Sequence, residues 1–250
     1  MYHRITPAPV PNDLYRNCLS VATFESHLRW LRMRGYESVD LGWVGRLLDA
    51  DTEPPGVPRK PFAITFDDGY LDNQEYALPL LERFGFMATI FVVTSTIGGT
   101  NSFDAPAAEG AVRMLSADDI RRLRKRGIHI GSHTHSHPQN LARLGDRELD
   151  FELRYSRRHL SDLLQEEIDH FAYPHSALDR RVEAEVARAG YRTACAGRGT
   201  RFNRYCLQRV PAASGSGAQL DLYCAWRRLK WRVRAVQGPC DQPATREGTG

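Results

Sequence analysis

The sequence predicts an α/β fold in which parallel strands alternate with helices. Short apolar runs, typical of strands, alternate along the chain with amphipathic segments that have helical spacing. One run, residues 87–93, is apolar almost throughout, as expected for a parallel strand buried on both faces. The chemically reactive residues also follow directly after predicted strands, which is the end of the strands where β/α barrels build their active sites.

The first part of the chain contains three further predicted strands and two predicted helices. Phe24, Leu28 and Leu31 recur at helical spacing, which predicts a helix over residues 23–36. A second helical pattern covers residues 73–85, with Pro79 as a kink or a boundary. The strands are expected at residues 1–5, 37–41 and 63–66.

The second part continues the alternation. A helix over residues 116–127 begins with Ser116 and Asp119 at capping-box spacing and ends at Gly127. A long amphipathic helix is expected over residues 147–164. The remaining elements are a helix over 178–190 and strands at 128–133, 168–174, 191–196 and 206–210. The chain therefore has about seven β/α units, and we see no internal repeat.

Composition is that of a globular protein. The 250 residues are 42% hydrophobic and 26% charged, with a formal charge of +4 that suits an anionic partner without requiring one. No apolar stretch reaches the roughly 18 residues of a transmembrane helix, and no secretory signal is present. The five cysteines lie far apart, which favours reduced thiols and a cytoplasmic location.

Two adjacent carboxylates, Asp67 and Asp68, end the strand at residues 63–66 and are followed by a glycine. Three histidines, His133, His135 and His137, follow the strand at residues 128–133. A solvated turn explains the aspartates alone, and a surface patch explains the histidines alone. Their joint position at strand ends favours a metal site, because a carboxylate with two imidazoles suits Zn²⁺ or Fe²⁺. One aspartate then binds the metal, and the other is left to act as a base.

Three segments together resemble a known family. These are TFDDG at residues 65–69, SHTHSHP at 132–138 and FAYPHSALD at 171–179. They are similar to the motifs of the polysaccharide deacetylases, the NodB-homology domain of carbohydrate esterase family 4. The resemblance covers residues 1–212 and implies a distorted (β/α)7 barrel with metal-dependent removal of N- or O-acetyl groups from sugars.

The resemblance implies a role for each motif residue. Asp67 corresponds to the general base, and Asp68, His133 and His137 to the metal ligands. His135 is the intervening position. The backbone N–H of His175, which follows Pro174, corresponds to the oxyanion donor. The ion is expected to be Zn²⁺, with Co²⁺, Fe²⁺ or Ni²⁺ as alternatives.

The chain departs from the family pattern at three places. Ala172 stands where an arginine often orients the base, and Arg209 near the end of the last strand is the candidate replacement. Ser176 stands where related sequences usually have glycine, which adds strain if the turn needs a positive φ. The C-terminal histidine that supplies the general acid is missing. His3 is one candidate acid, since first and last strands are neighbours in a barrel, and His175 is the other.

Several other residues are candidates for contact with substrate. Tyr70 follows the first motif, Tyr173 and Pro174 belong to the third, and Asn101 and Asp104 lie in a loop that resembles a substrate-side loop. Asp72, close to Tyr70, is expected to cap a helix rather than to bind metal.

The C-terminal tail, residues 213–250, differs in character from the domain at residues 1–212. It begins with glycines and continues with AWRRLKWRVRAV, where Trp226, Leu229 and Val233 share one face of a helix among arginines. Such a face suits peripheral contact with an anionic membrane, or packing on the barrel. Nucleic acid is not expected, because no companion motif is present. The rest of the tail has the composition of a disordered segment.

The expected function is metal-dependent deacetylation of an N-acetylated oligo- or polysaccharide. Peptidoglycan, chitin-like oligomers, poly-N-acetylglucosamine and a capsule or exopolysaccharide precursor all remain open as substrates. Two alternatives share the motifs: a metal-dependent amidase or imidase on the same barrel, and a carbohydrate-binding domain with impaired catalysis.

Overall fold

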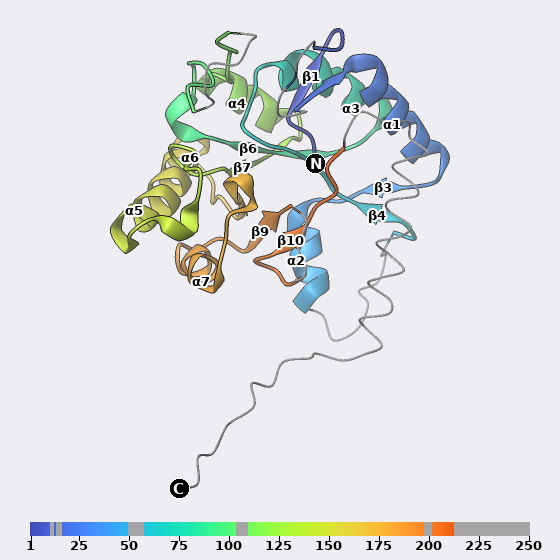
Figure 1. Ribbon diagram of the computed structural model, residues 1–250. Coiled ribbons are helices and arrows are strands. Elements are labelled where there is room, and N and C mark those ends of the chain that lie inside the picture. The colour runs from blue at the N-terminus through green and yellow to red at the C-terminus, as the bar shows by residue number, and fades with distance from the viewer. Residues whose placement is uncertain (11–12, 14–16, 50–57, 104–109, 198–201, 213–250) are drawn as a thin grey trace, which may run out of the picture.

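The computed structural model describes residues 1–10, 13, 17–49, 58–103, 110–197 and 202–212 (Figure 1). The predicted alternation of strands and helices is confirmed in a curled parallel sheet with the strand order β10–β9–β8–β7–β6–β5. Its strands are β5 (Ile64–Phe66), β6 (Ala88–Val92), β7 (His129–Ser132), β8 (His170–Ala172), β9 (Thr193–Ala196) and β10 (Leu207–Gln208). All neighbouring pairs in this sheet are parallel, so their carboxyl ends meet at one edge.

The first residues of the chain close the curled sheet. The N–H of Tyr2 donates to the carbonyl of Thr65 in β5 at 2.8 Å. On the other side, the amino group of Met1 donates to the carbonyl of Val210 at 2.8 Å, and the N–H of Ala212 donates to that of Met1 at 2.9 Å. The initial segment thus takes the seventh place of a distorted (β/α)7 barrel, between the first and last strands of the sheet.

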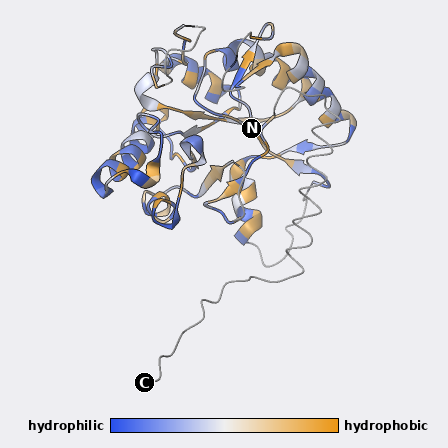
Figure 2. Cartoon of the chain, in the orientation of Figure 1, coloured by the Kyte–Doolittle hydropathy of each residue, from blue (hydrophilic) through white to orange (hydrophobic). Residues whose placement is uncertain are grey.

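Amphipathic helices cover the outer face of the sheet, and Figure 2 shows hydrophilic and hydrophobic residues side by side on them. The main helices are α1 (Val21–Met33), α3 (Leu78–Phe84), α4 (Ala117–Lys125), α5 (Asp146–Asp150), α6 (Ser156–Leu164) and α7 (Arg180–Arg188). The predicted stripe of α1 is buried at Phe24, Leu28 and Leu31. The predicted capping box of α4 is also present, with Ser116 and Asp119 bonding each other's backbone N–H groups.

Two predicted helices contain a π-helical turn. Residues 73–85 form the π turn η1 (Asn73–Ala77), which continues into α3 with Pro79 in the first turn of α3. The long helix at 147–164 is divided into α5, the π turn η4 (Phe151–Tyr155) and α6. Such turns arise where one residue is accommodated in excess of the regular ladder, and they are frequent near functional sites.

Some elements were not predicted from the sequence. Strands β2 (Cys18–Ser20) and β4 (Pro61–Phe62) pair with two strands that were predicted, β1 (Arg4–Thr6) and β3 (Glu37–Ser38). Strand β3 is shorter than the expected 37–41, because Leu41 begins a helix. The expected first strand is therefore divided, since Tyr2 bridges to β5 while Arg4–Thr6 pairs elsewhere. Helix α2 (Leu41–Asp49) inserts Leu41 into a small core inside the curled sheet. The other members of that core are Phe91, Ala172, Cys195 and Leu207.

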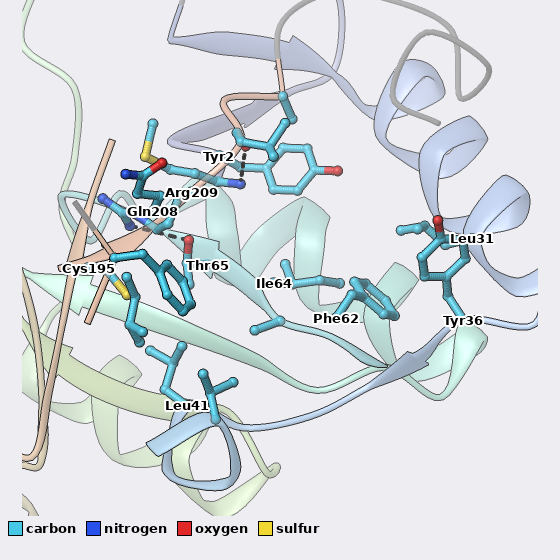
Figure 3. A pocket seen from close by; sticks show the side chains of 17 residues that line it. Tyr2, Leu31, Tyr36, Leu41, Phe62, Ile64, Thr65, Cys195, Gln208 and Arg209 are labelled. Carbon is cyan, nitrogen blue, oxygen red and sulfur yellow. Dashed lines mark hydrogen bonds between the residues drawn. The ribbon is translucent and has the colours of Figure 1, made fainter. Parts of the chain in front are cut away.

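A cavity of ≈ 260 Å³ lies beside this small core (Figure 3). Its lining is mostly apolar, with Phe62, Ile64 and Leu207 among its walls. Thr65 and Arg209 form a polar part of the wall. The cavity therefore meets the candidate site described below through one shared side chain, Arg209.

Two predictions from composition are tested only for the described residues. Within them, no helix is long and apolar enough to cross a membrane. Cys18, Cys195 and Cys206 form no disulfide in the described part of the chain. Cys224, Cys240 and the whole tail at 213–250, with its predicted membrane-facing helix, lie outside the described residues.

Candidate active site

Asp68, His133 and His137 come together at the carboxyl ends of β5 and β7. The Nε2 atoms of His133 and His137 lie 3.3 and 3.5 Å from Oδ1 of Asp68. One ligand atom from each of the three residues falls within 4.8 Å of the others, and all three side chains are buried. The predicted ligand triad is therefore assembled, and one carboxylate with two imidazoles is a donor set that fits a divalent transition metal.

Each histidine is held by contacts of its ring or backbone. The Nδ1 of His133 lies 2.8 Å from the carbonyl of Ala172, so Nδ1 donates and Nε2 is the ring nitrogen that faces Asp68. The N–H of His137 donates to Oγ1 of Thr134 at 3.0 Å. The His137 ring lies between two rings, with centroids 4.4 Å from Phe103 and 4.8 Å from His175.

Burial and neighbouring charges shift the pKa values of the two imidazoles in opposite directions. Burial, together with the charge of His133, lowers the pKa of His137 to about 3. Burial also disfavours charge on His133, but the carboxylates of Asp68 and Asp67 outweigh it and raise the pKa of His133. His137 is therefore neutral, as a metal ligand must be.

Asp67 has a different partner from Asp68. Nη1 and Nη2 of Arg209 donate to its two carboxylate oxygens at 2.6 and 2.7 Å. Nη1 also lies 3.2 Å from Oγ1 of Thr65. Burial raises the pKa of Asp67, but the charge of Arg209 outweighs this effect and holds the pKa well below its usual value. Arg209 therefore fixes the Asp67 carboxylate in a bidentate geometry.

Backbone strain is concentrated at the site. Among the described residues, six non-glycine residues have a positive φ, and five of them belong to the site segments. These five are Asp68 (73°), Thr134 (69°), His137 (58°), His175 (52°) and Ser176 (55°). Such conformations cost about 1–3 kcal/mol each and persist where surrounding contacts enforce them.

Ser176 has the positive φ that the sequence comparison made a concern. Its hydroxyl oxygen accepts a hydrogen bond from the N–H of Gly197 at 2.6 Å. A glycine at position 176 has no such acceptor. The serine therefore links the turn after β8 to the end of β9, which offsets part of the strain.

One residue of the site was missed by the sequence analysis. The carboxylate of Glu152, in the π turn η4, accepts hydrogen bonds from the N–H groups of His135 and Ser136 at 2.8 and 2.9 Å. It also accepts from the hydroxyl of Ser136. Glu152 is buried and holds the loop that carries His133 and His137. A lone glutamate in an amphipathic helix gave no signal for this role.

The other two candidate histidines near the site, His135 and His3, make different contacts. His135 turns away from the triad, and its Nδ1 lies 2.9 Å from Oγ1 of Thr94. His3 acts electrostatically on both Asp67 and Asp68, lowering the pKa of each in opposition to burial. Its carbonyl accepts a hydrogen bond from the side chain of Asn73 at 2.7 Å.

None of the candidate substrate residues that the structure describes lies at open surface. The exposed fractions of Tyr70 and Tyr173 are 2% and 1%, so both rings pack inside the protein, and Pro174 is buried as well. The side chain of Asn101 accepts a hydrogen bond from the N–H of Val112 at 2.8 Å, which closes its loop. Asp104 lies outside the described residues.

Asp72 does not cap a helix as expected. Its carboxylate instead accepts from Nε of Arg4 at 3.0 Å and from the N–H of Ile5 at 3.3 Å. No side-chain capping bond is present at this end of η1. Asp72 therefore fixes β1 to the start of η1, since the arginine offered a stronger partner than the helix N–H groups.

Comparisons with known proteins identify the family of this chain. The family model for polysaccharide deacetylase matches residues 55–194, more than half of the chain. The chain is 28% identical to YxkH of Bacillus subtilis (strain 168) over 229 residues, which cover 87% of this chain and 76% of that protein. It is 21% identical over 207 residues to the poly-β-1,6-N-acetyl-D-glucosamine N-deacetylase of Staphylococcus aureus, covering 76% of this chain and 68% of the relative.

Solved structures show the same fold. The deacetylase PplD of Streptococcus pyogenes superposes with a TM-score of 0.73 at 21% identity, covering 88% of this chain and 94% of that one. IcaB of Ammonifex degensii superposes with a TM-score of 0.70 at 23% identity, covering 88% and 92%. The fold and the family model define a hydrolytic deacetylase with a NodB-type fold. The chain belongs to the polysaccharide deacetylase family.

Proposed function

We propose that this deacetylase removes N-acetyl groups from a polysaccharide of N-acetylhexosamine units, with Asp67 as general base and a divalent metal ion as cofactor. The proposal rests on the observation that the two adjacent carboxylates have different partners. Asp67 is held by Arg209, whereas Asp68 faces two imidazole Nε2 atoms. We propose an N-acetyl rather than an O-acetyl group as the substrate, because the Staphylococcus aureus relative is named an N-deacetylase of poly-β-1,6-N-acetyl-D-glucosamine.

Asp68, His133 and His137 would hold the metal ion. Zn²⁺ is the first choice for this donor set, and Co²⁺, Fe²⁺ and Ni²⁺ also fit it. When bound, such an ion supplies Lewis-acid polarisation of a carbonyl and lowers the pKa of water. The fixed ring of His133, whose Nδ1 donates to Ala172, supports this assignment because metal-binding histidines are usually anchored in the same way.

Asp67 would accept the proton of the attacking water. Arg209 keeps its carboxylate ionised and fixes both oxygens, each of which retains a lone pair beyond the one that Arg209 occupies. A base fixed in this way loses little orientational freedom when the reaction begins. The next residue, Asp68, is engaged by imidazoles and is less suited to that task.

The turn after β8 would stabilise the oxyanion that forms on the acetyl carbonyl. His175 has a φ of 52°, which turns its N–H relative to those of Ser176 and Ala177. The latter two donate within the turn, to the carbonyls of Tyr173 and Pro174. A single such backbone donor contributes about 3 kcal/mol to the stabilisation of a transition state.

Two histidines are candidates for the acid that protonates the leaving amine. His175 packs against His137, and His3 acts on both aspartates from the first segment. We test them with His3→Gln and His175→Gln. Loss of the acid slows acetamide hydrolysis but spares an aryl acetate, whose leaving group needs no proton. A variant that slows both substrates equally does not remove the acid.

The decisive experiment measures acetate release from N-acetylated oligosaccharides. Protein stripped of metal and reloaded with Zn²⁺ or Co²⁺ is compared with Asp67→Asn. We expect release that requires metal and falls by at least about 10²-fold in the variant. Full activity without metal, or in Asp67→Asn, contradicts the mechanism. Stoichiometric metal binding without acetate release from any saccharide points to the amidase or the binding domain instead.

We further propose that residues 1–212 form the catalytic domain and that the basic tail at 213–250 contacts anionic membrane surfaces. The tail places Trp226, Leu229 and Val233 among arginines, as described for the sequence. Co-sedimentation with anionic and neutral vesicles tests this with the full chain and a chain ending at Ala212. Equal sedimentation of the two proteins with anionic vesicles contradicts the assignment.

A further inference from the structure

Two exposed aromatic side chains stack on each other beside the loop that carries the triad. Phe151 and Tyr155, both in the π turn η4, have exposed fractions of 49% and 44%. Their ring centroids are 4.9 Å apart with an interplanar angle of 22°. The ring of His135 meets both edge-on, at 5.3 Å from Phe151 and 4.7 Å from Tyr155. We refer to His135, Phe151 and Tyr155 as the aromatic patch.

The aromatic patch shares its support with the candidate active site. His135 lies two residues from each of His133 and His137, and two residues of chain span at most about 7 Å. Glu152, next to Phe151, accepts the N–H of His135. The same glutamate thus positions both the loop that carries His133 and His137 and the patch, so the patch adjoins that loop.

The charges around the patch favour a neutral ligand. Arg154 is paired with Asp150 on the same helical segment. Arg158, one turn further along, is paired with Asp162 at 3.6 Å. These cations are already balanced, so the patch does not offer the uncompensated positive charge that nucleic acid or an anionic membrane would select. Flat apolar rings with balanced charges beside them suit a neutral ligand with an apolar face.

We propose that the aromatic patch is a secondary saccharide-binding site, which holds sugar units of the polysaccharide beyond the unit that is deacetylated. This inference rests on the proposed function. A pyranose ring presents a face of C–H groups, which packs against the flat face of an aromatic side chain. A polymer continues past its reacting unit, so the surface adjoining the active site contacts the rest of the chain. Exposed aromatic area next to a functional loop is then a binding surface rather than unused area.

The test compares Phe151→Ala, Tyr155→Ala and the double variant on β-1,6-linked N-acetylglucosamine oligosaccharides of increasing length. We expect KM for long chains to rise about tenfold per ring removed, which corresponds to about 1.4 kcal/mol. We expect kcat, and all parameters with the disaccharide, to stay within twofold of the wild type. Phe151→Tyr keeps the flat ring and restores affinity for long chains, whereas Phe151→Leu keeps apolar area without the flat ring and does not.

Phe202 provides a matched control, because its side chain is 45% exposed and it lies on another part of the chain. Phe202→Ala leaves KM for long chains unchanged. Unchanged KM in the double variant, or an equal rise with Phe202→Ala, overturns the inference.

A binding measurement separates this inference from the proposed function. Retention of the metal-free protein in native gels that contain the entrapped polymer reports binding without catalysis. Normal acetate release with unchanged retention of the double variant overturns the patch and leaves the proposed function in place. Retention that is lost in the double variant, without acetate release by the wild type, supports the patch and overturns the proposed function.

Discussion

Asp68 interrupts the alternation of side chains that an extended strand imposes. Consecutive strand residues point to opposite faces, so Asp67 and Asp68 would diverge if β5 simply continued. The φ of 73° at Asp68 turns the chain, and both carboxylates then lie at the same end of the barrel with separate partners. The strain at this residue therefore places the proposed base and a proposed metal ligand side by side.

Removal of the Arg209 guanidinium is expected to lower both stability and acetate release. Arg209→Met leaves the Asp67 carboxylate buried without its partner, and breaking a buried ion pair on one side costs about 3–5 kcal/mol of stability. Arg209→Lys keeps a charge but not the bidentate geometry, so we expect intermediate stability and acetate release below that of the wild type. Urea unfolding and acetate release measure the two effects.

Arg204→Met is the matched control for Arg209→Met. Arg204 forms an ion pair with Asp49 at the surface, and such pairs contribute about 0–1 kcal/mol. Equal loss of stability in Arg204→Met and Arg209→Met would show that the buried pair of Arg209 with Asp67 contributes no more to stability than a surface ion pair.

Ser176 separates backbone strain from hydrogen bonding. Ser176→Ala keeps the positive φ and loses the bond to Gly197, whereas Ser176→Gly loses the bond but relieves the strain. We expect the free energy of unfolding of the glycine variant to exceed that of the alanine variant by about 1 kcal/mol. Urea denaturation of both variants measures this difference. If alanine is the more stable of the two, the turn does not store strain at this residue.

At the scale of elements, the π turn η4 determines where Glu152 points. Glu152→Ala removes the acceptor for the N–H groups of His135 and Ser136, so the loop between His133 and His137 loses its support. Residues that orient metal ligands typically contribute 10–100-fold to metal affinity, and we expect a loss of about that size. Titration of metal-free protein with Zn²⁺ against a chelating indicator measures it.

Glu148→Ala is the control for Glu152→Ala. Glu148 lies one turn earlier, is exposed, and accepts the N–H of Gly145 at 3.0 Å. Its loss frays the start of α5 without reaching the loop. A similar fall in Zn²⁺ affinity in both variants would mean that Glu152 acts through general stability rather than through the loop.

The elements with a strong sequence pattern were predicted well. Strand β6 was predicted from its unbroken apolar run, and α4 from the capping box of Ser116 and Asp119. The proximity of Asp68, His133 and His137 was predicted because these residues belong to short motifs at strand ends. The strand at residues 1–5 was predicted only in outline, because its division between β5 and β2 depends on which neighbours reach it.

The remaining features depend on contacts between distant segments. Helix α2 was missed because Leu41 was assigned to the strand at 37–41, although Asp40 accepts the N–H of Trp43 as a helix cap does. Leu41 packs inside the curled sheet, against residues far away in the sequence. The role of Glu152 needs the π turn, whose excess residue rotates the side chain toward the loop. The bidentate pairing of Arg209 needs the closed barrel. Local patterns carry none of this information, since each contact joins residues far apart in the sequence.

At the scale of the whole molecule, one buried histidine makes stability depend on pH. Burial is the main cause that lowers the pKa of His170 to about 4, against the opposing charge of Asp169. The folded protein keeps this imidazole neutral, while the unfolded chain binds a proton below about pH 6.5. The stabilisation is therefore complete above pH 6.5 and is lost as the pH falls toward 4, by up to about 3 kcal/mol.

His170→Asn tests this dependence, because asparagine can replace the hydrogen bond from Nδ1 to Thr193 Oγ1 without titrating. We expect the free energy of unfolding of the wild type to fall by about 2 kcal/mol more than that of the variant between pH 7.5 and pH 5. Urea denaturation at both pH values gives the comparison. Parallel losses in the two proteins would assign the acid sensitivity to other groups.

The closure of the barrel also has a consequence for the order of folding. Asp67 and Arg209 are 142 residues apart, and the Met1 and Val210 partners are 209 apart. Contacts at such separations form late, because much of the chain must be ordered before they repay the entropy of loop closure. On a ribosome, the two aspartates emerge long before the arginine that pairs with one of them. The chain thus orders the proposed base only with the final docking of the last strand, and catalytic activity is expected to report the completion of folding.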